Sequence, residues 1–183
     1  ESEPVTVTYN VTPNDADQAD LKPGDKVKVD NPAKLTTTEK GQVSAGITTA
    51  NPTAPIKSIT VNDDGSADVT FNDGSTKTVP SNVVQTDKGK YTVAAGKPVT
   101  LTHGKQVKAG DSLDSIAVTL TDAKGQPVSL PAGAKVVWTE APDTSEVGND
   151  KTGKAKVVYV DKSESEPVTV TYNVTPNDAD QYT

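Results

Sequence analysis

Apolar and polar residues alternate in short runs along most of the chain, and this period of two predicts half-buried β-strands. Residues 5–11 are typical, because Val, Val, Tyr and Val alternate with Thr, Thr and Asn directly after Pro4. Further strands are predicted in the first half at residues 26–29, 56–61, 67–71 and 76–79. Asp-Gly pairs separate the last three strands, which favours tight hairpins and therefore a three-stranded meander.

The hydrophobic pattern changes once from the period of a strand to that of a helix, between the predicted strands at 26–29 and 56–61. Thr36 and Glu39 form a capping box, in which each side chain accepts from the backbone N–H of the other residue. Val43, Ile47 and Ala50 follow on one helical face, and Asn51-Pro52 ends the pattern. Gly41 and Gly46 weaken this helix, so it must lie on a sheet. The apolar face it would cover consists of Ile59, Val61, Val69, Phe71 and Val79.

These elements predict a small α+β module over residues 19–86, with one helix on a short antiparallel sheet. A polar stretch at residues 85–90 marks a boundary, and the pattern over residues 87–183 is entirely β. Strands are expected at 91–94, 98–103, 116–121, 127–130, 135–139, 154–160 and 167–174, with turns at 109–111, 122–125, 131–133 and 150–153. Seven short strands predict an immunoglobulin-like β-sandwich, with Trp138 as its core anchor. The fold class is therefore mainly β.

The chain also contains a long exact repeat. Residues 1–18 are identical to residues 164–181, so residue 1 matches residue 164 at an offset of 163. Such an identity indicates a tandem array of near-identical units. We therefore interpret residues 1–18 as the closing strand and linker of a preceding repeat, with residues 13–18 as a polar turn. Residues 5–11 are expected to add a strand to the first module or to pair on an exposed edge.

Composition narrows the function classes. The net charge is −7 and every basic residue is Lys, which argues against nucleic acid and phosphoryl chemistry. The absence of Cys excludes disulfides, thiol catalysis and Cys-ligated zinc. Met is absent too, and a chain without oxidisable sulfur suits an exposed, oxidising location, although chance in a Val- and Thr-rich sequence explains it equally well. No apolar run is long enough to cross a membrane, and no initiator Met or signal peptide is present, so we expect a piece of a longer protein.

Candidate chemistry is sparse. His103 is the sole His, without a nucleophile motif, and is expected to be an exposed loop residue. Asp63, Asp64, Asp68 and Asp73 suggest calcium but lack the spacing of a calcium loop, so turn geometry accounts for them, as it does for Asp143 and Glu146.

Two further modifications are open from the sequence. A glycosylation sequon begins at Asn10 and again at Asn173, and we take both as incidental to a Thr-rich strand. A Lys–Asn isopeptide cross-link is a second possibility that the sequence does not pair. No catalytic, cofactor-binding or metal-binding residue is therefore assigned, and no cofactor is expected.

The second half resembles the Rib domain family, in its long form. The resemblance is carried by Lys135-Val-Val-Trp138, Ala141-Pro-Asp-Thr-Ser-Glu-Val-Gly148, Lys151-Thr-Gly-Lys-Ala-Lys-Val-Val-Tyr159 and Pro167-Val-Thr-Val-Thr171. Where the family often reads Tyr-Pro-Asp-Gly, this chain has Tyr159-Val-Asp-Lys-Ser163, so a differently built turn is expected. Phe71-Asn-Asp-Gly74 in the first half looks like a relative of that motif.

The resemblance implies an immunoglobulin-like fold displayed in tandem on a cell-wall-anchored surface protein of Gram-positive bacteria. The expected function is a non-catalytic stalk or spacer that projects an adhesive region, with neighbouring repeats as partners. The alternative is an adhesin module that binds a host glycoprotein or glycan through many weak contacts. That alternative predicts exposed, clustered tyrosines among Tyr9, Tyr91, Tyr159 and Tyr172.

Overall fold

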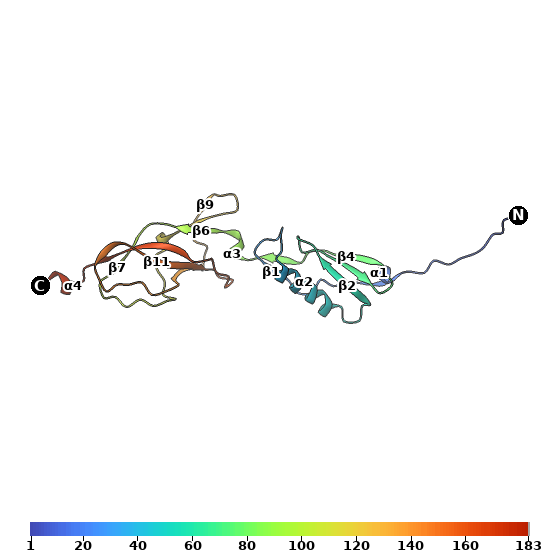
Figure 1. The fold of residues 1–183 in the computed structure, drawn as a ribbon, viewed down its shortest axis with the longest axis horizontal. Coiled ribbons are helices and arrows are strands. Elements are labelled where there is room, and N and C mark those ends of the chain that lie inside the picture. Colours follow the sequence, from blue (N-terminus) through green and yellow to red (C-terminus); the bar gives the residue numbers. More distant parts are fainter. Residues whose placement is uncertain (183) are drawn as a thin grey trace. The chain divides into compact units, whose positions relative to one another are not determined.

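A computed structural model describes residues 1–182 and divides the chain into two compact units (Figure 1). Unit 1 comprises Glu1–Val84 and unit 2 comprises Gln85–Thr183. Each unit has its own hydrophobic core. The molecule is mainly β, as the alternating pattern predicted.

Unit 1 is one helix on an antiparallel sheet. Its elements are α1 (Asp15–Gln18), β1 (Val27–Val29), α2 (Thr37–Ala50), β2 (Ile56–Val61), β3 (Ala67–Phe71), β4 (Thr76–Val79) and β5 (Val83–Gln85). The order β2-β3-β4 is the predicted meander, and β1 pairs with β5 in a separate two-stranded sheet. The short strand β5 was not predicted.

The helix α2 forms for the predicted reasons. Thr36 accepts from the backbone N–H of Glu39 and the Glu39 carboxylate accepts from that of Thr36, so the capping box is present. Val43 and Ile47 are buried against the meander. The apolar face predicted for the sheet is confirmed, since all five of its members belong to this core.

Unit 2 is a β-sandwich preceded by a short helix, α3 (Asp87–Lys90). One sheet has the order β10-β11-β12-β7 and the other the order β6-β8-β9. Their strands are β6 (Thr92–Ala95), β7 (Val99–Thr102), β8 (Val118–Thr121), β9 (Pro127–Val128), β10 (Lys135–Trp138), β11 (Gly148–Val158) and β12 (Val168–Thr175). A 3-10 turn, η1 (Ser115–Ala117), precedes β8, and a helix, α4 (Asp178–Gln181), follows β12. Strand β12 is central, antiparallel to β11 and parallel to β7.

Trp138 anchors the sandwich as predicted, with only 1% of its surface exposed. Its ring meets Tyr172 edge-on at a centroid distance of 5.6 Å. Gly153 lies beneath the ring, where a Cβ would approach the Trp138 Cζ3 atom to 2.8 Å. The Lys-Thr-Gly motif thus supplies a glycine because the indole ring packs directly on the backbone.

Several expectations about local structure were wrong. Residues 87–183 are not entirely β, because they include α3, η1 and α4, and η1 covers the start of the strand predicted at 116–121. Residues 5–11 are extended but pair with no strand among the described residues, and Val5, Val7, Tyr9 and Val11 are 74–86% exposed. Residues 15–18 form a helix, not a turn, because Asn14 caps it. The predicted turn at 150–153 lies inside β11, where pairing with β12 continues past an irregularity between Gly148 and Lys151.

The closing turns of the two units are built alike. In unit 1, Phe71 N–H donates to the Ser75 carbonyl and Gly74 N–H donates to the Phe71 carbonyl. In unit 2, Tyr159 N–H donates to the Ser163 carbonyl and Lys162 N–H donates to the Tyr159 carbonyl. Gly74 and Lys162 both have positive φ, at 85° and 69°. The two turns are therefore built alike, as their related motifs suggested, although the second places a lysine where glycine is favoured. The expectation of a differently built turn at Tyr159–Ser163 was wrong.

Candidate functional site

The last helix of unit 2 is fastened by the one histidine. His103 Nδ1 lies 2.6 Å from Asp180 Oδ2, and His103 Nε2 lies 3.0 Å from the Ser145 carbonyl oxygen. The Asn177 amide donates to the His103 carbonyl at 3.1 Å. Thus His103 is half-buried and bonded, and the expectation of an exposed loop histidine was wrong.

This geometry favours the imidazolium form. A carboxylate and a carbonyl oxygen only accept, so both ring nitrogens donate, which requires the protonated ring. The Asp180 carboxylate is the main cause that raises the pKa of His103 above its ordinary 6.5, while nearby Lys151 opposes it. The Asn177 backbone N–H, and then His103, lower the pKa of Asp180. With both nitrogens engaged, neither is left to move a proton for a substrate.

The Pro-Asp-Thr-Ser turn contains Ser145, whose carbonyl oxygen contacts His103, and further hydrogen bonds hold this turn in place. Its Asp143 N–H donates to the Tyr172 hydroxyl at 3.0 Å, and the Thr144 hydroxyl donates to the Lys105 carbonyl at 2.7 Å. Asp143 also accepts from the Ser145 hydroxyl, which lowers the Asp143 pKa. The Glu146 carbonyl accepts from the Lys151 ammonium at 2.8 Å. This arrangement agrees with the surface turn expected for Asp143 and Glu146.

The first helix, α1, has the same sequence as α4 but different partners. Asp15 N–H donates to Asp73 Oδ2 at 2.7 Å, and Ala16 N–H donates to the Ser75 hydroxyl oxygen at 3.0 Å. The Lys77 ammonium donates to the carbonyls of Ala16 and Ala19, at 3.3 and 2.5 Å. Asp73 and Ser75 belong to the closing turn of unit 1, so that turn binds the first helix of the same unit.

Helix α3 precedes unit 2 and is bound in the same manner. Asp87 N–H donates to Asp161 Oδ2 at 2.9 Å, and Lys88 N–H donates to the Ser163 hydroxyl oxygen at 3.0 Å. We call the three-residue segments Asp73–Ser75 and Asp161–Ser163 the Asp-x-Ser turns. Each unit therefore holds a short helix on its own Asp-x-Ser turn.

The aspartates weighed for calcium are occupied by local partners. Asp64 and Asp73 each accept from a serine two residues on, Asp68 accepts from Thr78, and Asp63 pairs with Lys40. Over residues 1–182, no cluster of three or more carboxylate or imidazole side chains is arranged to hold a metal ion.

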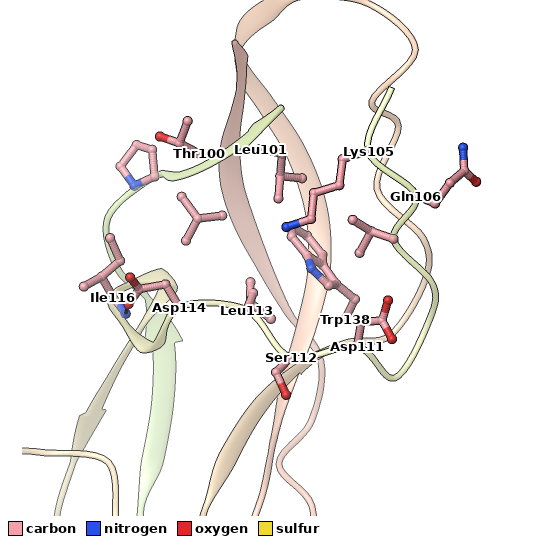
Figure 2. Close-up of a pocket in the computed structure, with 13 residues that line it drawn as sticks. Thr100, Leu101, Lys105, Gln106, Asp111, Ser112, Leu113, Asp114, Ile116 and Trp138 are labelled. Carbon is pink, nitrogen blue, oxygen red and sulfur yellow. Dashed lines mark hydrogen bonds between the residues drawn. The ribbon is translucent and has the colours of Figure 1, made fainter. Parts of the chain in front are cut away.

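A surface hollow lies beside Trp138 (Figure 2). It has a volume of about 630 Å³ and is lined by residues of β7, of the segment that leads to η1, and by Trp138. Lys105 points into it. Its two carboxylates serve the backbone, since Asp111 accepts from Lys108 N–H and Asp114 from Ile116 N–H. The Trp138 ring is buried and offers no exposed stacking face.

The tyrosines do not form an exposed cluster. Tyr159 and Tyr172 are buried, and Tyr91 is half-buried and stacks on Tyr159 at a centroid distance of 5.8 Å. Burial raises the pKa of Tyr159 to about 12. Tyr9 is 81% exposed, but it occupies the same position in the repeat as the buried Tyr172.

The modifications weighed from sequence find little support in the described part of the chain. Thr144 is the one buried polar residue there, so no buried Lys–Asn pair is present over residues 1–182. Asn173, in the second sequon, accepts from Asp150 N–H at 2.9 Å. In that same range, no helix is both long enough and apolar enough to cross a bilayer.

Sequence reasoning missed the short helices α1 and α4 and their partners. Asn14 and Asn177 each precede an acidic residue by three positions, and each pair forms a capping box. That spacing was the available signal. No pattern in the sequence indicated that Asp180 would meet His103, 77 residues away.

Two family models match the chain. The model described as an atypical Rib domain covers residues 19–88, and the model described as a Rib domain covers residues 87–176. A search of curated protein sequences found no match.

Solved structures give weaker similarity. A mutant of the SrpA adhesin from Streptococcus sanguinis is 32% identical over 38% of this chain and 38% of its own, with a TM-score of 0.36. The sialic-acid-binding region of the Streptococcus sanguinis SK1 adhesin, bound to 3'sLn, is 18% identical over 91% of this chain and 49% of its own, with a TM-score of 0.39. The chain therefore spans half or less of both.

Proposed function

Because the chain belongs to the Rib domain family, with an atypical Rib domain followed by a Rib domain, we propose that it is one period of a tandem array in a bacterial surface protein. The array acts as a stiff, non-catalytic spacer that projects an adhesive region from the cell wall. In this proposal residues 19–86 and 87–183 are the two domains of the period, and residues 1–18 are the closing strand and linker of the period before.

One observation carries the proposal. Val7, Tyr9 and Val11 are exposed in the first copy of the repeated segment. Their counterparts in the second copy are Val170, Tyr172 and Val174, which are 0–3% exposed in the core of unit 2. Residues 5–11 form an exposed apolar segment whose sequence is identical to that of a core strand. This exposure is explained if these residues complete the sandwich of a preceding domain.

The site geometry supports a structural role over the alternative. His103 and the Asp-x-Ser turns bind segments of the chain itself. Trp138, Tyr159 and Tyr172 are buried and Tyr91 stacks on Tyr159, so the exposed Tyr9 and Tyr182 have no aromatic neighbour among them. Binding of a host glycoprotein or glycan by each unit is the competing hypothesis, and the same protein samples test it.

The experiment compares one period with two. The two-period chain consists of residues 1–181 followed by a second copy of residues 19–183. Small-angle scattering should show a maximum dimension that grows by nearly one full period length, because solenoid-like arrays extend through nearest-neighbour contacts. A two-period profile that fits a flexible pair of beads overturns the stiff spacer. Saturable binding of the single period to extracellular-matrix proteins or to a sialylated glycan favours the adhesin module instead.

A further inference from the structure

The repeated sequence Asn-Asp-Ala-Asp-Gln gives the same structure in both copies. We call α1 and α4 the two copies of the linker helix. In each copy the Asn caps the helix and the second Asp closes the capping box. Ala16 corresponds to Ala179, and Asp17 corresponds to Asp180. The chain therefore shows one helix in two different surroundings.

In unit 1 the linker helix is bound through its backbone. The N–H groups of Asp15 and Ala16 donate to the Asp-x-Ser turn, and the carbonyls of Ala16 and Ala19 accept from Lys77. Asp15, Ala16 and Ala19 are half-buried as a result, and both alanines pack against the core of unit 1. Asn14 and Asp17, by contrast, are exposed in this copy.

In unit 2 the linker helix is bound through its side chains. The Asp180 carboxylate and the Asn177 amide contact His103. The residues that face the Asp-x-Ser turn in the other copy, here Asp178 and Ala179, are exposed.

The two sets of contacts are complementary. One set uses backbone N–H and carbonyl groups, and the other uses a carboxylate oxygen and an amide nitrogen, so no atom is required by both. Asp15 and Ala16 are half-buried in the first copy, whereas their counterparts Asp178 and Ala179 are exposed. Asn14 is exposed in the first copy, whereas its counterpart Asn177 is half-buried. One helix therefore has two binding faces, of which each copy in this chain displays one in use and one vacant.

We propose that in the array each linker helix is bound on both faces at once, by His103 of the Rib domain before it and by Asp73 and Ser75 of the atypical Rib domain after it. The partner for the vacant face is thus a second copy of this repeat. The inference rests on the proposed function, because it requires consecutive periods in one chain.

Two-sided binding would make the joint stiff. A helix of four residues does not persist alone in water, since the cost of nucleation exceeds what so few hydrogen bonds return. The stiffness of the joint then resides in contacts on both sides of the helix and not in the linker itself. Each contact forms in this chain without the other, but a joint with both faces of the helix bound can form only between consecutive repeats.

The two-period chain described above tests this proposal with two reporters. A single thiol reports the face toward the Asp-x-Ser turn, and a single imidazole reports the face toward His103. The chain contains no cysteine, so Ala179→Cys in the first period places a single thiol on the helix at the joint. His103→Gln in the second period leaves a single imidazole, next to the same helix. Single-period chains with Ala16→Cys or Ala179→Cys calibrate the thiol reaction rate with Ellman's reagent for the covered and the exposed face.

We expect the thiol at the joint to react as slowly as in the single-period Ala16→Cys chain, while the remaining imidazole keeps a raised pKa by proton NMR. Both results together mean that both faces are occupied. A thiol that reacts as fast as in the single-period Ala179→Cys chain overturns the inference. So does an imidazole pKa that falls to its ordinary value once the thiol is protected, since the two faces then exclude one another.

Matched variants separate the faces. Ser75→Ala in the second period should restore the fast thiol reaction, whereas Ser66→Ala should not, although Ser66 makes the same hydroxyl contact to an aspartate two residues before it. Asp180→Asn in the first period should return the imidazole pKa toward 6.5. Asp17→Asn disturbs the same capping box away from His103 and should leave that pKa unchanged.

Failure of the joint and failure of the stiff spacer give different results. Protected thiol and raised pKa in a chain whose scattering is flexible would leave the joint intact and reject the stiff spacer. An extended, stiff two-period chain whose thiol is unprotected would reject the joint and leave the spacer standing.

Discussion

The two units use the same turn to hold a preceding helix, yet they close their cores differently. In unit 1 a helix, α2, covers the meander, and Phe71 is the largest buried side chain. In unit 2 a second sheet covers the first, and Trp138 is the largest. The Asp-x-Ser turns nevertheless make matching hydrogen bonds to α1 and α3. The comparison indicates that the way a module joins its neighbour is separable from the way it fills its core.

The largest effect is expected from a substitution that disrupts the core of unit 1 and leaves its Asp-x-Ser turn unchanged. Phe71→Ala should lower the free energy of unfolding of unit 1 by about 3–5 kcal/mol, because it removes a buried aromatic ring and leaves a cavity. Far-UV circular dichroism reports α2 in unit 1, and Trp138 fluorescence reports unit 2. Phe71 packs in the core of unit 1 alone, so the fluorescence transition should keep its midpoint. Equal shifts of both transitions would show that the cores are not separate.

A smaller effect is expected at the contact between Trp138 and Gly153. Gly153→Ala places a Cβ 2.8 Å from the indole ring and should destabilise unit 2 by about 1–3 kcal/mol through overpacking. Trp138 fluorescence in a urea titration measures it. The matched change in unit 1 is Gly41→Ala, where no atom lies within 4 Å of the new Cβ and the helix should gain about 1 kcal/mol. A Gly153→Ala chain as stable as the parent would mean that the ring shifts without cost.

Where local signals were strong, the sequence was sufficient. Strands β2, β3 and β4 begin and end at the predicted residues, because Asp-Gly turns separate them and Pro55 and Pro80 flank the meander. The cap at Thr36 likewise gave the start of α2.

The first part of β11 could not be predicted in this way. It contains Gly148, Asp150 and Gly153, which are typical of turns, and only its pairing with β12 makes it a strand. The contacts of the two short helices could not be predicted for a related reason. The capping-box spacing indicates the helices themselves, but the partner of α1, Asp73, and the partner of α4, His103, are distant in sequence.

The closing turns offer a third comparison, with a smaller expected change in the free energy of unfolding. Lys162 has a φ of 69°, which disfavours a side chain by roughly 1 kcal/mol. Lys162→Gly should therefore stabilise unit 2, by less than about 1 kcal/mol because glycine also gains freedom in the unfolded chain. Gly74→Ala at the equivalent position should destabilise unit 1 by about 1 kcal/mol, since a Cβ there has space but the φ of 85° is strained. The test is whether thermal unfolding midpoints move in opposite directions.

The smallest effect concerns pH, and it belongs to unit 2, the unit that contains the histidine. The raised pKa of His103 stabilises the folded state fully below pH 6.5, and this contribution is lost as the pH rises through the folded value. The lowered pKa of Asp180 contributes above pH 3.8 and is lost as the pH falls through its folded value.

Attachment of α4 should therefore be strongest between about pH 3.8 and 6.5 and weaken above it. The side chains of His103 and Asp180 are 28% and 29% exposed, so solvent and salt screen the pair and the gain is modest. Proton NMR titration of the imidazole measures the pKa of His103. A pKa of His103 at or below 6.5 would contradict the expectation. So would an unchanged pKa in the Asp180→Asn chain, because Asp180 is the main cause of the raised value. Unit 1 contains no histidine, so this pH dependence should be confined to unit 2.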